Sequence, residues 1–151
     1  MLSGWGPLEG DLKRLASALP NGAEIGFLPR EELVDDYRKA DLFIHAGEVE
    51  LEGMSVLESM SAGLPALIAD APESAASHFA LNDDFRFPRG DSAALAAKID
   101  FLIENPGTLA AAREPYRARA REFDFQASVG KLVEVYRTVI ANAAMPLRET
   151  A

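Results

Sequence analysis

The chain has 151 residues, of which 48% are hydrophobic, 8% aromatic and 26% charged, a composition typical of one folded globular domain. It carries 15 Lys and Arg against 24 Asp and Glu, and its formal net charge of −9 argues against nucleic acid as a partner. The absence of cysteine excludes disulfides, thiolate zinc sites and a cysteine nucleophile. No apolar run approaches the roughly 20 residues of a membrane span, so we expect a cytoplasmic domain.

Apolar residues at helical spacing alternate with short apolar runs along the chain. In order, they predict a helix at 8–19, a strand at 23–28, a helix at 30–39, a strand at 42–44, a helix at 53–62 and a strand at 64–69. A weaker strand at 85–87, a helix capped by Asp91, a helix near 109–123 and a helix across 129–140 follow. This alternation predicts an α/β fold with a doubly wound, Rossmann-like parallel sheet over residues 1–141, and a frayed tail at 142–151.

The segment between the predicted strands at 42–44 and 64–69 carries the most chemical information. Ligands of such sheets bind beyond the carboxyl ends of the strands, where this segment begins. The free N–H groups at the start of the next helix predict a site for phosphate or sugar oxygens; they belong to Gly53, Met54, Ser55 and Val56. Glu50 and Glu58 can flank the same ligand, and a carboxylate that accepts two hydroxyl hydrogen bonds is typical of ribose binding.

Other interpretations of these residues stay open at this point. Ser55-x-x-Glu58 is also a capping box, in which the serine caps the helix and the glutamate returns a bond to its backbone. The acidic loop 48–52 is either solvated or, together with Asp70, a weak Mg²⁺ site. His45, at a predicted strand end, either lies near a bound sugar or has a structural role.

The order of several motifs resembles that of a known family. The motifs are Glu50-x7-Glu58 with Ser59-Met60-Ser61-Ala62-Gly63-Leu64-Pro65, Ser3-Gly4-Trp5-Gly6-Pro7, Ile25-Gly26-Phe27-Leu28-Pro29 and Tyr37-Arg38-Lys39-Ala40-Asp41-Leu42-Phe43. They are similar to motifs of the retaining glycosyltransferases of family four. That family has two Rossmann-like domains, the GT-B architecture, and its C-terminal domain holds the nucleotide-sugar donor. The stretches 45–50, 71–76 and 79–81 resemble the bacterial cholesterol and diacylglycerol glucosyltransferase branch.

The resemblance implies a role for each matching position. Glu50 would lie beside the donor sugar as the catalytic carboxylate that stabilises the transition state, and Glu58 would bind the ribose. The backbone of 53–56 would hold sugar hydroxyls and the distal phosphate, and Phe27-Leu28 would meet the base. The family implies no metal and no cofactor. The implied reaction is transfer of a sugar, glucose from UDP-glucose, to a lipid or saccharide acceptor with retained anomeric configuration.

Two departures from the family pattern affect these expectations. The chain resembles a donor domain that is incomplete at its N-terminus and lacks the N-terminal acceptor domain, so we expect no turnover by the chain alone. Glu52 stands where many members have an aromatic residue. The apolar face of the last helix, which would otherwise face the missing domain, predicts self-association, and the full-length protein would be peripheral at the inner face of the membrane.

The alternatives are a catalytically dead nucleotide-sugar binding module, a sugar-nucleotide epimerase of the same architecture, and an unrelated doubly wound phosphatase or receiver domain. The last of these is weakened because no Asp-x-Asp segment stands at a strand end.

Overall fold

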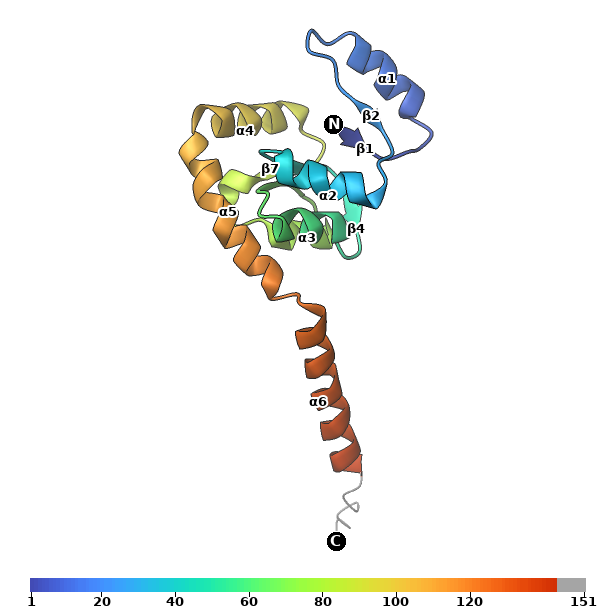
Figure 1. Cartoon of the computed structure of the whole chain (residues 1–151), viewed down its shortest axis with the longest axis vertical. Helices are drawn as coiled ribbons and strands as arrows, with labels where there is room; N and C mark the ends of the chain where they lie inside the picture. Colours follow the sequence, from blue (N-terminus) through green and yellow to red (C-terminus); the bar gives the residue numbers. More distant parts are fainter. Residues whose placement is uncertain (144–151) are drawn as a thin grey trace. The chain divides into compact units, whose positions relative to one another are not determined.

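The computed structural model describes residues 1–143, which form two compact units, residues 1–40 and the chain from Asp41 onward. The first unit consists of β1 (Leu2–Ser3), α1 (Glu9–Ser17), β2 (Ile25–Gly26) and α2 (Arg30–Lys39) (Figure 1). β1 pairs with β2 in parallel, with Leu2 opposite Ile25. The two predicted helices and the strand are therefore confirmed, but α1 buries only Ala16, so its predicted leucine face is largely exposed.

The second unit continues the alternation of strands and helices. Its elements are β3 (Phe43–His45), β4 (Val49–Glu50), α3 (Met54–Ser61), β5 (Ala66–Asp70), β6 (Glu73–Ser74), the 3₁₀ helices η1 (Ala75–Phe79) and η2 (Asp83–Phe85), β7 (Arg86–Pro88), α4 (Ser92–Glu104), α5 (Pro106–Arg121) and α6 (Phe125–Ala143). Asp91 caps α4 as predicted, because its carboxylate accepts a hydrogen bond from the Ala94 N–H at 2.9 Å.

The central sheet of the second unit has the order β3-β5-β7, and all of its pairings are parallel. β5 is the middle strand, and its residues 66–69 are completely buried, as expected for a strand covered on both faces. β4 and β6 form a separate parallel pair in which Glu50 lies opposite Ser74. The predicted parallel α/β architecture is confirmed, and β4 places Glu50 in a defined backbone register.

The core of this unit lies around β5 and is closed by α5. Tyr116 of α5 is fully buried; its hydroxyl donates a hydrogen bond to the Ala66 carbonyl at 2.7 Å and accepts one from the Leu81 N–H at 3.4 Å. Burial raises the pKa of Tyr116 to about 12. Its ring packs edge-on against Phe85, with 5.5 Å between the ring centroids. This residue therefore ties α5, β5 and the segment before β7 together.

The last helix, α6, buries none of its residues. Apolar side chains recur along it at spacings of four and three, at Phe125, Val129, Leu132, Tyr136, Val139 and Ala143. Its charged side chains, Lys131, Glu134 and Arg137, fall between these positions. The helix extends two residues beyond the predicted domain end at 141, and the rest of the predicted tail, from 144 on, lies outside the described residues. Across residues 1–143, no helix is long and apolar enough to cross a bilayer.

Candidate donor-binding site

The carboxyl ends of the three sheet strands, at His45, Asp70 and Pro88, meet at one edge of the second unit. The loops that follow β3 and β7 approach each other there, since the Arg89 guanidinium lies 3.8 Å from the Glu48 carboxylate. Both side chains are about half exposed, so this ion pair adds little to stability. The edge is nevertheless the place where a parallel sheet of this kind offers a ligand crevice.

Helix α3 begins at this edge from a left-handed residue, Gly53, with φ +68° and ψ +37°. Gly53 is the N-cap, no side chain caps the helix, and Ser55 is already inside the first turn. The capping box considered for Ser55 and Glu58 is therefore wrong, because the chain enters the helix through a glycine conformation two residues earlier. Helix geometry leaves the first-turn N–H groups of Met54 and Val56 without intrahelical acceptors, so they are available to a ligand.

The turn at Gly53 is closely packed against η1. A Cβ atom on Gly53 would lie 3.0 Å from Cε2 of Phe79 and 3.3 Å from Cα of Ala76. Phe79 and Ala76 belong to η1 and are both buried. Sequence reasoning missed these two residues, because the contact joins segments more than 20 positions apart and follows no local period.

Glu50 supplies the carboxylate nearest to this turn. Its Oε1 accepts a hydrogen bond from the Glu52 N–H at 3.2 Å. The backbone N–H groups of Gly53 and Glu52 hold the pKa of Glu50 below its ordinary value, and His45 adds a smaller attraction. Glu50 is therefore ionised at neutral pH. The structure brings Glu50 and Gly53 together, with the carboxylate bound on amides that a ligand would otherwise use. That both residues contact a donor stays a prediction.

His45 stands at the end of β3 within the electrostatic reach of Glu50. Burial lowers the pKa of His45, and the Glu50 charge opposes this shift. Its Nε2 is buried without a hydrogen-bond partner among residues 1–143, as is Oγ of Ser74, the register partner of Glu50. Gly47 makes room for the imidazole, because a Cβ there would lie 2.9 Å from Nε2. Buried polar atoms without partners are rare in proteins. Here one belongs to the residue that interacts electrostatically with Glu50 and the other to the residue opposite Glu50 in the strand pair.

The other predicted site residues differ in how far their side chains are exposed to a ligand. The side chain of Val56 is fully buried, so only its backbone can face a ligand, whereas Met54 is 54% exposed. Glu58 is partly buried on the second turn of α3, and Glu52 is exposed. Phe27 and Leu28 follow β2 in the first unit, where Phe27 is 70% exposed and Leu28 is partly buried.

Carboxylates do not gather into a metal site in the described part of the chain. No group of three or more His, Asp and Glu side chains among residues 1–143 is arranged to hold an ion. Asp70 is exposed, and Glu48 faces Arg89. The Mg²⁺ interpretation of the acidic loop therefore gains no support from the structure.

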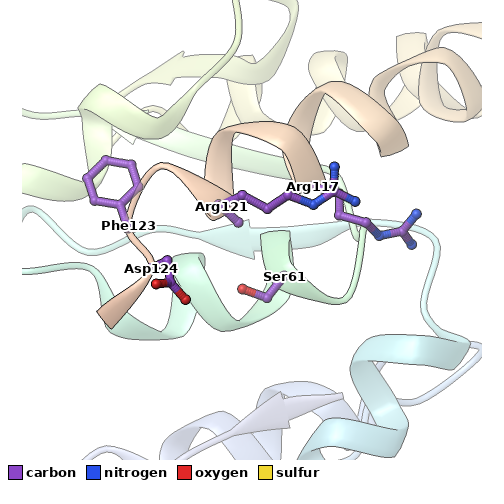
Figure 2. Close-up of a pocket in the computed structure, with 6 residues that line it drawn as sticks. Ser61, Arg117, Arg121, Phe123 and Asp124 are labelled. Atoms are coloured by element: carbon purple, nitrogen blue, oxygen red, sulfur yellow. The ribbon is translucent and has the colours of Figure 1, made fainter. Parts of the chain in front are cut away.

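Two surface hollows of the second unit lie away from these residues. One, of about 570 Å³, is lined by Ser61, Arg117, Ala120, Arg121, Phe123 and Asp124, where α3 ends and α5 leads into α6 (Figure 2). The other, of about 520 Å³, lies between the segment 81–85 and the first half of α5. Neither contains Glu50, Glu58 or the first turn of α3, so the candidate site is not one of these two hollows.

Comparisons with known proteins identify the family. The model of the family "Glycosyl transferases group 1" matches residues 1–123. The catalytic domain of the cholesterol-α-glucosyltransferase from Helicobacter pylori has a similar structure, with a TM-score of 0.77 and 35% sequence identity over 82% of this chain and 77% of that one. The Anabaena protein HepE, solved in complex with UDP-glucose, shares the fold with a TM-score of 0.71 at 23% identity, over 87% of this chain and 36% of that one.

Among curated proteins, the sulfoquinovosyl transferase SQD2 of Arabidopsis thaliana is 30% identical over 132 residues, which is 85% of this chain. The match covers 26% of the plant protein, so this chain spans about a quarter of the length of that relative. The family match covers most of the described chain and agrees with the parallel α/β fold and with the motif order. The chain belongs to the group 1 glycosyl transferases and has the fold of the C-terminal domain of the GT-B architecture.

Proposed function

We propose that this chain is the donor-binding part of a retaining glycosyltransferase that moves glucose from UDP-glucose to a lipid or saccharide acceptor. The observation that carries the proposal is the turn at Gly53, which opens α3 at the carboxyl edge of the sheet with the ionised Glu50 bound on its amides. Glucose and a lipid acceptor are supported by the similarity to the Helicobacter pylori enzyme, whose name specifies cholesterol and glucose.

The roles of the residues follow from their chemistry. The N–H groups of the first turn of α3, together with the helix dipole, would bind the donor phosphate. Glu58, one turn further along, would accept hydrogen bonds from the ribose hydroxyls. A donor oxygen that takes the neighbouring amides at 52 and 53 would release the Glu50 carboxylate toward the sugar, where its negative charge would stabilise an oxocarbenium-like transition state.

The charge balance of the chain sets the expected affinity. A net charge of −9 opposes a donor that itself carries a diphosphate, and the helix N-terminus contributes only about 0.3–1 kcal/mol. The first turn of α3 holds no basic residue to compensate. We therefore expect weak, millimolar donor binding and no detectable sugar transfer by the chain alone.

Ligand-observed NMR by saturation transfer tests this proposal, using UDP, UDP-glucose, GDP and ADP with the wild-type chain and Glu58→Ala. The expected result is preference for the uridine ligands and a loss of affinity of about tenfold or more in the variant, because charged hydrogen bonds to the ribose are removed. Glu104→Ala, at the exposed end of α4, is the matched control and should bind normally. Equal binding by Glu58→Ala and wild type would contradict the proposed site.

We also propose self-association through α6. The seam formed by its apolar positions, from Phe125 to Ala143, has the alternating four and three spacing of helices that pack along one another. The charged residues Glu134 and Arg137 pair within the helix at 2.7 Å and stay off this seam. A second copy of α6 is the partner that this pattern fits, because no charged side chain lies at the seam positions.

A further inference from the structure

The ring of Phe79 contacts both the turn at Gly53, here called the donor turn, and the connection that leads from α5 to α6. On one side its Cε2 is 3.0 Å from the position that a Cβ of Gly53 would take. On the other side it packs edge-on against Phe123, with 5.2 Å between the ring centroids and 80° between the planes. Phe79 is only 6% exposed, so its ring is held in place by these neighbours.

Phe123 is fixed by the backbone of this connection. Its N–H donates to the Ala120 carbonyl at 3.1 Å, and the next residue, Asp124, accepts a hydrogen bond from the Ala127 N–H at 2.9 Å and so starts α6. Figure 2 shows the Phe123 ring turned away from the side chains of Ser61 and Asp124, which line the same hollow. Phe123 is 47% exposed, so the solvent-facing side of this ring can change without opening the core.

We propose that Phe79 is a positioning residue for the turn at Gly53 and that Phe123 holds its ring in the required place. This inference rests on the proposed function, because it concerns the same donor site. No side chain caps α3, so the orientation of its first N–H groups depends on the residues that pack against Gly53. The two-ring contact joins this packing to the α5–α6 connection, and a movement of that connection would alter donor affinity.

The test uses Phe123→Leu, which removes the ring but keeps an apolar side chain, and Phe123→Tyr, which keeps the ring. We expect Phe123→Leu to shift the amide resonances of residues 53–56 in the ligand-free chain and to weaken UDP-glucose binding about two- to tenfold, the range of one edge-on aromatic contact. Phe123→Tyr should restore both readouts. Phe125→Leu, at a neighbouring residue that is 73% exposed, is the control and should leave both unchanged.

A second variant approaches the contact from the other ring. Phe79→Leu should move the same amide resonances at least as far as Phe123→Leu, because it removes the contact with Gly53 as well as the contact with Phe123. The double variant should move them no further than Phe79→Leu, because Phe123 acts on the turn through the Phe79 ring. If Phe123→Leu leaves the amides of 53–56 at their wild-type positions, the proposal is overturned. If the wild-type chain binds no UDP-glucose, the proposed function fails, and the amide shifts of the free chain still decide whether the rings position the turn.

Discussion

Replacing Gly53 by alanine adds a methyl group where both the backbone conformation and the neighbouring side chains oppose it. The backbone there is left-handed, with φ +68°, and a methyl group would meet Cε2 of Phe79 at 3.0 Å and Cα of Ala76 at 3.3 Å. The left-handed conformation costs a non-glycine residue about 1–2 kcal/mol. Crowding against a buried ring and a backbone atom adds about 1–3 kcal/mol. The expected loss in the free energy of unfolding is therefore roughly 2–5 kcal/mol.

Gly90→Ala separates the two contributions within the same unit. Gly90 is also left-handed, with φ +71°, but the nearest atom to its Cβ position is Oε1 of Glu48 at 3.7 Å, an ordinary contact. We expect this variant to lose only the conformational part, about 1–2 kcal/mol. Urea unfolding followed by circular dichroism measures both variants against the wild type.

The comparison of the two alanine variants tests whether Phe79 and Ala76 crowd the Cβ position of Gly53. Gly53→Ala should lose clearly more stability than Gly90→Ala, and should also lose nucleotide binding because the amides of the turn are displaced. Equal losses in the two variants would refute the argument, since they would show that nothing crowds Gly53. Unchanged UDP-glucose affinity in a folded Gly53→Ala chain would show that the turn does not bind the donor.

Three further outcomes follow from the structure. Tyr116→Phe should lower the free energy of unfolding by about 1–3 kcal/mol in urea, because it removes the hydroxyl that pairs with a buried carbonyl and a partly buried amide. Tyr136→Phe, at a residue 60% exposed, should be neutral, and equal effects of the two variants would contradict this. Burial lowers the pKa of His45, so the folded state binds a proton at this imidazole less readily than the unfolded state does. The free energy of unfolding should therefore fall as the pH drops below the ordinary pKa of 6.5. In a pH series of unfolding curves, His45→Gln should remove the fall in the free energy of unfolding just below pH 6.5. It should keep the further fall below the ordinary Glu50 pKa of 4.5, because the lowered pKa of Glu50 causes that one. The same slope near pH 6.5 in the variant and the wild type would contradict this. In sedimentation velocity the wild-type chain should associate as its concentration rises, and Leu132→Ser should not; identical profiles would remove α6 from the interface.

Local sequence signals located most of the fold. Helix 30–39 has the predicted bounds, and Asp91 caps α4, because both depend on neighbouring residues and on periodicity. β4 and β6 were missed, because Val49–Glu50 and Glu73–Ser74 contain charged residues and form no apolar run. The start of α3 was assigned one residue early, and the alternative of a capping box at Ser55 and Glu58 is excluded, because the left-handed glycine, not the serine, opens the helix.

The candidate site also combines residues that the local sequence indicates with residues that only tertiary packing brings in. Apart from Phe27 and Leu28, the residues predicted to bind the donor or to act in catalysis come from one continuous segment, 45–58, and their roles stay predictions. The structure joins Glu50 to the turn at Gly53. The support behind that turn comes from Phe79 and Phe123, which are 44 positions apart and meet only through tertiary packing. The predicted contact of Phe27 and Leu28 with the base involves the other unit and stays a prediction.

The central claim is that the first turn of α3 binds a nucleotide sugar, and the most direct measurement is a protein-observed NMR titration of the chain with UDP-glucose. We predict that the largest amide shifts fall on residues 53–56 and Glu58 and that they disappear in Glu58→Ala. Shifts concentrated instead around the hollow lined by Ser61 and Arg117, or persisting in the variant, would contradict the account.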